Sequence, residues 1–229
     1  MTKLKVGIVG VGGIAQTHMP GWHATEDAEV VAGSDIREEA LQSWGREHGV
    51  DRLYTDPSDL FDDSEIDIVD VCTPNSYHAP LAIAALNAGK HVIVEKPLEI
   101  TLARCDAIID ACKSNRVQLF TVFPSRFHES SQLLKTAVDK NKFGRLSMGD
   151  AYVKWFRTQE YYDSGAWRGT WRLDGGGALM NQAIHTIDLL SGLRGPVVEV
   201  TAQADLLAHE RIEVEGVVVE TVRFKNGAL

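Results

Sequence analysis

The start of the chain restricts the fold more than any other segment. An apolar run, Leu4 to Val9, leads directly into Gly10-Val11-Gly12-Gly13-Ile14-Ala15. In this G-x-G-x-x-G/A pattern the first glycine permits a tight turn and the second lets the backbone approach a pyrophosphate. The pattern predicts a strand, a phosphate-binding loop and a helix whose unpaired N–H groups favour anions. The residues expected to contact the phosphates are Gly10, Gly12, Gly13 and Ile14.

Asp35 supports a dinucleotide as the ligand of this loop. It follows the next strand-like run, residues 29–34, and lies 23 residues beyond Gly12. An acid at this position accepts hydrogen bonds from ribose hydroxyls, and its charge repels a 2′-phosphate, which favours NAD. Arg37 can offset that repulsion and admit NADP. An ordinary strand–helix turn with a solvated Asp35 is the alternative interpretation of the same residues.

An α/β fold with a doubly wound parallel sheet is what the first half of the chain predicts. Strand-like and helix-like runs alternate, which implies right-handed crossovers that cover a parallel sheet on both faces. Pro20 predicts a kink in the first helix or its early end. Strands are expected at residues 4–9, 29–34, 66–72, 91–94 and 118–123, and helices from residue 13 and at 38–48, 76–88 and 102–113. We therefore expect an N-terminal Rossmann domain over residues 1–123.

The pattern changes after Pro124, where strands follow one another with few helices between them. We expect helices at 131–140 and 178–190 and strands at 145–157, 197–207 and 217–224. This order is typical of an α+β domain with an open, mainly antiparallel sheet. Residues 124–229 are accordingly assigned to a second domain for substrate binding and oligomerisation.

Composition excludes several classes of partner. The chain has 229 residues, 44% of them hydrophobic, which suffices for two domains, and a formal net charge of -9. That charge disfavours nucleic acids and anionic membrane surfaces, and no apolar run is long enough to span a membrane. The three cysteines, Cys72, Cys105 and Cys112, lack metal-ligand spacing and an even count, so we expect no metal site. Free thiols and the absence of a signal-peptide pattern favour the cytoplasm.

Two further segments place polar residues where a predicted strand ends. Thr73, Asn75 and His78 follow the strand at 66–72, at the sheet edge where ligands of open α/β folds bind. Turn formation explains the same residue types equally well, and His78 alone favours a surface position at a helix start. Glu95-Lys96 follows the apolar run at 91–94, where a charged pair needs a partner. Lys96 either donates to a substrate oxygen or forms a structural pair with Glu95.

Asn181 and His185 stand four residues apart in a predicted helix, so they share one face of it. The Gly175-Gly176-Gly177 run before this helix leaves room for a ligand at its start. A histidine among apolar neighbours is, however, ordinarily a core residue whose hydrogen bonds are satisfied. The spacing alone therefore does not decide between a site and a packed core.

The segments GVGGIA, CTPNSYH, AGKHVIVEKP, YYDSGAWRGTW and GGGALMNQAIHTIDLL, in this order, resemble the Gfo/Idh/MocA family of NAD(P)-dependent sugar oxidoreductases. The resemblance implies hydride transfer between a nicotinamide cofactor and a CH–OH group of a sugar, sugar derivative or cyclic polyol. It implies that Lys96 and His185 lie beside the nicotinamide and the sugar, and that Arg168 reaches the substrate. It also implies that Asn75 and Glu95 contact the cofactor, and we add Thr73, His78 and Lys96 to that set.

The chain departs from the family pattern in two respects. Many relatives carry Asp where this chain has Asn181, and Asn can position a ligand but cannot ionise. Proton transfer then falls on His185, with Lys96 polarising the reacting oxygen and Asn181 as the third catalytic residue. Relatives also continue beyond residue 229, so we expect an incomplete second domain and a homo-oligomer formed through its exposed sheet. An NAD-dependent glycoside hydrolase and a truncated, non-catalytic NAD-binding protein are the alternative functions.

Overall fold

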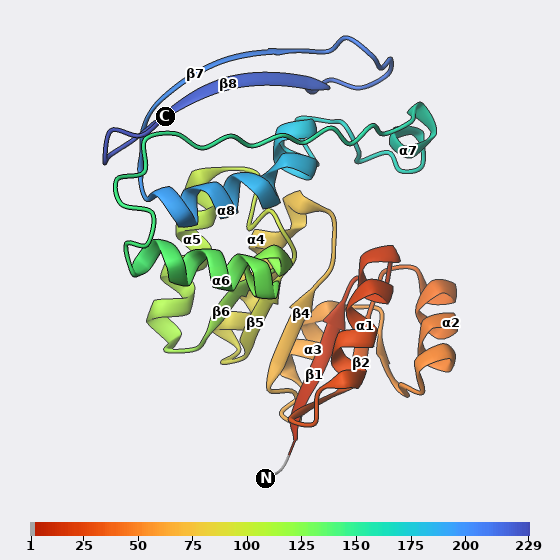
Figure 1. Cartoon of the computed structure of the whole chain (residues 1–229). Coiled ribbons are helices and arrows are strands. Elements are labelled where there is room, and N and C mark those ends of the chain that lie inside the picture. The colour runs from red at the N-terminus through yellow and green to blue at the C-terminus, as the bar shows by residue number, and fades with distance from the viewer. Residues whose placement is uncertain (1–2) are drawn as a thin grey trace. The chain divides into compact units, whose positions relative to one another are not determined.

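The computed structural model describes residues 3–229, and the chain divides into two compact units between Val122 and Phe123 (Figure 1). Each unit contains its own sheet. Across the described residues, no helix combines the length and the hydropathy that crossing a membrane requires.

The first unit is built on a six-stranded parallel sheet with the order β3-β2-β1-β4-β5-β6. This is the strand order of a Rossmann fold, so the predicted fold class is confirmed. The order reverses between β1 and β4, and ligands of open α/β sheets bind at such a switch point. The strands are β1 (Leu4–Val9), β2 (Ala28–Ser34), β3 (Arg52–Tyr54), β4 (Ile68–Val71), β5 (His91–Val94) and β6 (Leu119–Thr121).

Helices cover both faces of this sheet (Figure 1). α1 (Gly13–Ala24) and α2 (Glu38–His48) enclose one core cluster with Ile8 and Trp44. α3 (Pro57–Asp62), α4 (His78–Asn87) and α5 (Leu102–Asn115) enclose the other. β3 and α3 were not predicted, although the side chain of Asp56 accepts the Ser58 N–H and Pro57 opens α3, which is a recognisable helix start.

Pro20 does not end α1, so of the two expected outcomes, a kink or an early end, the early end is wrong. Proline removes one backbone donor and its ring crowds the carbonyl four residues earlier. Ala15 and Met19 are nevertheless buried in the core cluster beneath α1, and the helix continues to Ala24. Tertiary packing of the buried face outweighs the local preference, as it does for most helices.

The second unit combines short helices with a two-stranded antiparallel sheet. β7 (Val197–Asp205) pairs with β8 (Val217–Phe224), in agreement with the predicted antiparallel class. The predicted helices are found as α6 (Glu129–Asp139) and as the π-helical turn η3 (Leu179–Ala183), which leads into α8 (Ile184–Arg194). The helices that sequence analysis did not predict here are η2 (Pro124–Phe127) and α7 (Gln159–Asp163).

The strand expected at residues 145–157 is wrong, because this segment has no regular secondary structure. Its backbone meets another segment near Ser147 and Gly149, which exchange hydrogen bonds of 3.1 and 3.0 Å with Leu229. A strand is stable only when a neighbour continues the ladder, and among the described residues the pairing extends no further here. Residue alternation alone cannot supply that neighbour.

Candidate active site

The loop after β1 has the geometry of a phosphate cradle. Gly10 has a φ of +89°, and a Cβ there would lie 2.9 Å from the Cys72 carbonyl oxygen, so only glycine fits. A Cβ at Gly12 or Gly13 would meet nothing within 4 Å. Gly12 precedes α1, whose first turn has no side-chain cap. Open space therefore faces the uncapped N–H groups at the start of a twelve-residue helix, which fits a pyrophosphate.

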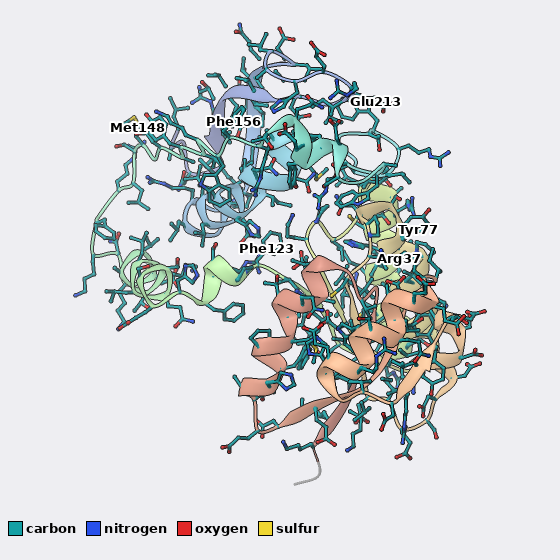
Figure 2. All side chains as sticks on the ribbon, turned by 90° about the vertical axis from the view of Figure 1, so that its right-hand side faces the viewer. Arg37, Tyr77, Phe123, Met148, Phe156 and Glu213 are labelled. Atoms are coloured by element: carbon teal, nitrogen blue, oxygen red, sulfur yellow. The ribbon has the colours of Figure 1, made fainter. Side chains whose placement is uncertain are left out.

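Asp35 lies directly against this loop, at the end of β2. Its carboxylate accepts the Val11 N–H at 3.1 Å and the Arg37 N–H at 2.9 Å. The Arg37 guanidinium also donates to it, at 3.1 and 3.2 Å, while 63% of the Arg37 side chain stays exposed. The structure thus brings Asp35, Arg37 and the glycine loop together, and Arg37 and Tyr77 lie beyond the ends of the strands (Figure 2).

His78 is fully buried, so the surface position expected for it is wrong. α4 buries His78, Ala82 and Ala85, which share one helical face. The two ring nitrogens lie 2.8 Å from the Pro97 carbonyl oxygen and 2.9 Å from the Thr73 carbonyl oxygen. Burial lowers the pKa of His78, although both carbonyl contacts oppose that shift. The ring therefore joins the loop after β4 to the turn after β5, and Asn75, in the short helix η1 (Asn75–Tyr77), is buried beside it.

Glu95 and Lys96 follow β5 directly. The Glu95 Oε2 atom accepts the Lys96 backbone N–H at 2.8 Å, and Oε1 lies 3.1 Å from Nε2 of His18. The Glu95 carboxylate is almost completely buried. The partner that this buried carboxylate requires is therefore a histidine of α1, which sequence analysis did not single out.

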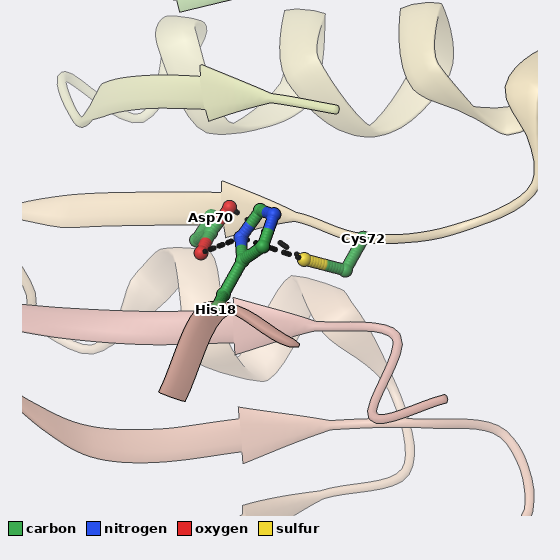
Figure 3. A group of neighbouring side chains, drawn as sticks. All are labelled: His18, Asp70 and Cys72. Atoms are coloured by element: carbon green, nitrogen blue, oxygen red, sulfur yellow. Dashed lines mark hydrogen bonds and ion pairs between the residues drawn. The ribbon is translucent and has the colours of Figure 1, made fainter. Parts of the chain in front are cut away.

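His18 of α1 forms a cluster of polar side chains with Asp70 of β4 and Cys72, which follows β4 (Figure 3). Its Nδ1 atom lies 2.8 Å from Oδ2 of Asp70, which also accepts the indole N–H of Trp22 at 2.9 Å. The Cys72 thiol donates to the other Asp70 oxygen at 3.6 Å. Two signals could have revealed the cluster: His18 shares a helical face with Ala15 and Trp22, and Asp70 interrupts an apolar strand.

The charges of this cluster follow from burial and hydrogen bonding. Burial alone lowers the pKa of His18, but the hydrogen bonds to Asp70, Cys72 and Glu95 outweigh it and raise the pKa to about 12. Burial and the Asp70 charge raise the pKa of Cys72 to about 12 as well. Both shifts favour a protonated His18 ring beside a protonated Cys72 thiol.

In the second unit Arg168 is held by aromatic rings. Its Nη1 atom donates to the Tyr161 hydroxyl at 2.7 Å. The guanidinium carbon lies 4.3 Å from the Tyr161 ring centroid and 4.5 Å from that of Trp167. Stacking of this kind restricts a guanidinium and stabilises its charge. Arg168 thus presents a positive group in a fixed orientation.

Asn181 is hydrogen-bonded to a buried carboxylate that sequence analysis did not single out. Its Nδ2 atom donates to Oδ1 of Asp174 at 2.6 Å, and the Gly169 N–H donates to Oδ2 at 2.8 Å. Asp174 is 2% exposed. Asp174 therefore connects the segment after Arg168 to the helix of Asn181 and His185. The amide at position 181 has a physical reason, because it supplies a donor that an ionised carboxylate could not.

The family models divide the chain as the structure does. Residues 4–123 match the model described as an oxidoreductase family with an NAD-binding Rossmann fold. Residues 131–229 match the GFO/IDH/MocA C-terminal domain. The chain belongs to the Gfo/Idh/MocA family. The resemblance stated from the motifs is thereby confirmed.

Relatives of this chain are dehydrogenases of sugars and polyols. Myo-inositol 2-dehydrogenase of Thermotoga maritima is 34% identical over 99% of this chain and 66% of its own length. Levoglucosan dehydrogenase of Pseudarthrobacter phenanthrenivorans is 30% identical over 100% of this chain and 66% of its length. The crystal structure of the WlbA dehydrogenase from Bordetella pertussis, in complex with NADH and UDP-GlcNAcA, has a TM-score of 0.93 and 38% identity. That likeness covers 99% of this chain and 69% of WlbA. The chain spans about two thirds of the length of the curated relatives.

Proposed function

We propose that this protein is an NAD-dependent oxidoreductase that transfers a hydride between the nicotinamide and a CH–OH group of a sugar, sugar derivative or cyclic polyol. The observation that carries the proposal is the open cradle at Gly12 and Gly13, with Asp35 beside it. It is supported by the sugar and polyol dehydrogenases among the relatives.

The cofactor would be held at the switch point of the sheet. Gly10, Gly12, Gly13 and Ile14 would surround the pyrophosphate, and Asp35 would accept hydrogen bonds from the ribose hydroxyls. Arg37 already shares the Asp35 carboxylate, which lowers the repulsion that a 2′-phosphate would meet there. Because Arg37 reduces this repulsion without removing it, we expect the protein to bind NAD more tightly than NADP. Further cofactor contacts would come from residues that follow β4 and β5, namely Thr73, Asn75, Glu95 and Lys96. His78 would hold these two segments in place through its contacts with the carbonyl oxygens of Thr73 and Pro97.

The bound nicotinamide would supply the hydride chemistry, and the chain's own residues would move the proton. His185 would take the hydroxyl proton as general base, and the Lys96 ammonium would stabilise negative charge on the reacting oxygen. Asn181, oriented by Asp174, would position the substrate hydroxyl. The roles of Lys96 and His185 are supported by their motifs and that of Asn181 by its contact with Asp174, and substitution of each residue tests its role.

Within this class we propose that the substrate carries an anionic group, and a nucleotide-linked uronic acid is our first choice. The Arg168 guanidinium lies against the rings of Tyr161 and Trp167 and carries a positive charge, which suits a carboxylate or phosphate better than a neutral polyol. The WlbA structure, with 38% identity, contains such a ligand, UDP-GlcNAcA. Arg168 would then be the specificity residue, and Arg168→Lys keeps its charge but loses the planar fork.

A panel of myo-inositol, levoglucosan and UDP-GlcNAcA, each with NAD and with NADP, tests the proposal through NADH or NADPH absorbance. Turnover of any one of the three supports the oxidoreductase, and turnover of UDP-GlcNAcA that Arg168→Lys impairs supports the anionic substrate. Release of a reducing sugar from a glycoside without net NADH formation would indicate the hydrolase instead. Tight NAD binding without turnover of any substrate would indicate a non-catalytic binding protein.

We also propose a homo-oligomer that forms through the second-unit sheet, in the cytoplasm. Every residue of β7 is exposed, and both strands carry exposed valines, with Val200 on one face of the sheet and Val217 and Val219 on the other. Exposed apolar faces and unpaired sheet edges favour association. The three cysteines are free, which suits a reducing compartment. The valines concerned are Val197, Val198, Val200, Val217 and Val219.

A further inference from the structure

The His18 cluster connects three elements that meet at the switch point of the sheet. His18 lies on α1, Asp70 on β4, and Glu95 immediately after β5. Side chains two residues apart on a strand share a face, so Asp70 and Cys72 both point towards α1. The two contacts of the ring with Asp70 and Glu95 join residues that are 52 and 77 positions apart in the chain.

One imidazole ring spans two buried carboxylates in this cluster. Nδ1 lies 2.8 Å from Asp70 and Nε2 lies 3.1 Å from Glu95, so both ring nitrogens are in position to donate. Asp70 is fully buried and Glu95 nearly so, and two uncompensated carboxylates there would be costly. The groups that face the ring are Asp70 and Cys72 from β4 and its end, and Glu95 from the end of β5. A doubly protonated ring satisfies both acids at once.

The donor atoms of His18, Asp70 and Cys72 also lie within 4.8 Å of one another, which a metal ion could bridge. A metal requires an unprotonated ring nitrogen and a thiolate. Here Nδ1 of His18 lies 2.8 Å from Oδ2 of Asp70, and the Cys72 thiol donates to the other Asp70 oxygen, so the three groups are hydrogen-bonded to one another. The arrangement is therefore a hydrogen-bonded network whose protons hold it together.

We propose that His18 is a positioning residue: held between Asp70 and Glu95, its ring fixes the Glu95 carboxylate beneath the Lys96 amide and so orders the turn that carries Lys96. The path runs from Nε2 of His18 to Oε1 of Glu95, and from Oε2 of Glu95 to the Lys96 N–H at 2.8 Å. Because α1 also begins at the phosphate loop, the same ring ties that loop to Lys96. The consequence for catalysis rests on the proposed function, in which the Lys96 ammonium stabilises negative charge on the reacting oxygen.

Two substitutions separate the two halves of the network. Glutamine at position 18 places an amide nitrogen at the distance of Nε2 and can still donate to Glu95. Asparagine places one at the distance of Nδ1 and can still donate to Asp70. Both variants remove the charge and one hydrogen bond, so they are matched in general destabilisation. Only His18→Asn releases Glu95.

The first measurement is the rate of hydrogen exchange at the Lys96 backbone amide, which NMR monitors on the whole chain without substrate. We expect His18→Asn to accelerate exchange of the Lys96 N–H by about tenfold or more, with His18→Gln within about threefold of the parent protein. The Glu95 N–H, which donates to the Val71 carbonyl at 3.0 Å, is the internal control and should stay protected in both. Equal exchange at Lys96 in the two variants would overturn the proposal.

The second measurement is turnover on the substrate that the panel identifies. We expect His18→Asn to lower kcat by about tenfold or more relative to His18→Gln, with the Kd for NADH nearly unchanged. Equal kcat values in the two variants would overturn the link to Lys96. If the parent protein turns over nothing, the proposed function fails, while the exchange measurement still decides whether His18 positions the turn.

A third measurement needs no variant and so does not depend on variants folding. Side-chain ¹⁵N NMR of the parent protein should show His18 with both ring nitrogens protonated at about pH 9, well above the ordinary histidine pKa of about 6.5. Its resonance can be assigned through the indole N–H of Trp22, which shares the Asp70 carboxylate. A His18 ring that is neutral at that pH would overturn the proposal.

Discussion

Asn181→Asp would place at position 181 the carboxylate that the family resemblance implies, and the structure predicts that this change alone lowers the stability of the protein at neutral pH. Asn181 Nδ2 lies 2.6 Å from Oδ1 of Asp174, so the variant would place a second carboxylate against a buried one. Two unit charges at that separation repel by about 6 kcal/mol at an effective dielectric constant of about 20. Keeping a proton on one carboxyl at pH 7, from an ordinary pKa of about 3.9, costs about 4 kcal/mol. Because the second cost is smaller, the pair should retain a proton.

The sign of the pH dependence follows from that retained proton. At neutral pH the folded variant would bind a proton that the unfolded chain does not bind, so its stability must fall as the pH rises. We expect Asn181→Asp to match the parent protein at about pH 4 and to lose about 4 kcal/mol at about pH 7. Urea denaturation at the two pH values measures this difference through the shift in midpoint. A variant as stable as the parent at both pH values would refute the reasoning.

The double variant Asp174→Asn with Asn181→Asp is the matched control. The new amide at position 174 would accept the Gly169 N–H through its oxygen and donate through its nitrogen to the new carboxylate at position 181. Both original hydrogen bonds are then kept, while the negative charge moves from position 174 to position 181. We expect this variant to recover most of the lost stability at about pH 7. It is also the correct probe of proton transfer, since it places a carboxylate at position 181 without a buried charge pair. A shift in the basic limb of its pH–rate profile would show that position 181 is coupled to His185.

The remaining predictions concern the cofactor, the proton-transfer residues and the oligomer. Asp35→Ser should narrow or reverse the preference for NAD, and calorimetry that shows equal or better NADP affinity in the parent protein would contradict the assignment of Asp35. Lys96→Ala and His185→Ala should each lower kcat by about 100-fold or more while sparing NAD affinity, the scale of general acid–base groups. Full activity in His185→Ala would show that this histidine is a core residue without a catalytic role. Light scattering over a dilution series should show self-association that Val198→Lys with Val200→Lys weakens, whereas a monodisperse parent monomer would contradict the oligomer.

Several features that depend on neighbouring residues could be predicted from the sequence. The loop at Gly10 to Ala15 could be predicted because the turn, the backbone approach and the helix start all lie within one short segment. The alternation of strands and helices indicated the parallel sheet for the same reason, since each period is local. The ion pair of Asp35 with Arg37 also joins residues two positions apart.

The sequence was not sufficient where a distant partner decides the outcome. Residues 145–157 have an alternating pattern, but a strand also needs a neighbour, which no local pattern encodes. His78 could be placed on a helix but not on its buried face, because burial depends on what α4 packs against. In both cases the prediction was wrong because the deciding information lay elsewhere in the chain.

The two residues most clearly missed, His18 and Asp174, follow the same logic and suggest a better rule. Each is a polar side chain on a buried face or in a buried turn, and its partners lie between 5 and 77 positions away. Burying such a group costs free energy unless a partner compensates, so an ionisable residue at an apolar position implies an unseen partner. Asp70, within an apolar strand, already required one. A search that pairs every such acid with every inward-facing histidine or amide would have joined Asp70 to His18, and Asp174 to Asn181.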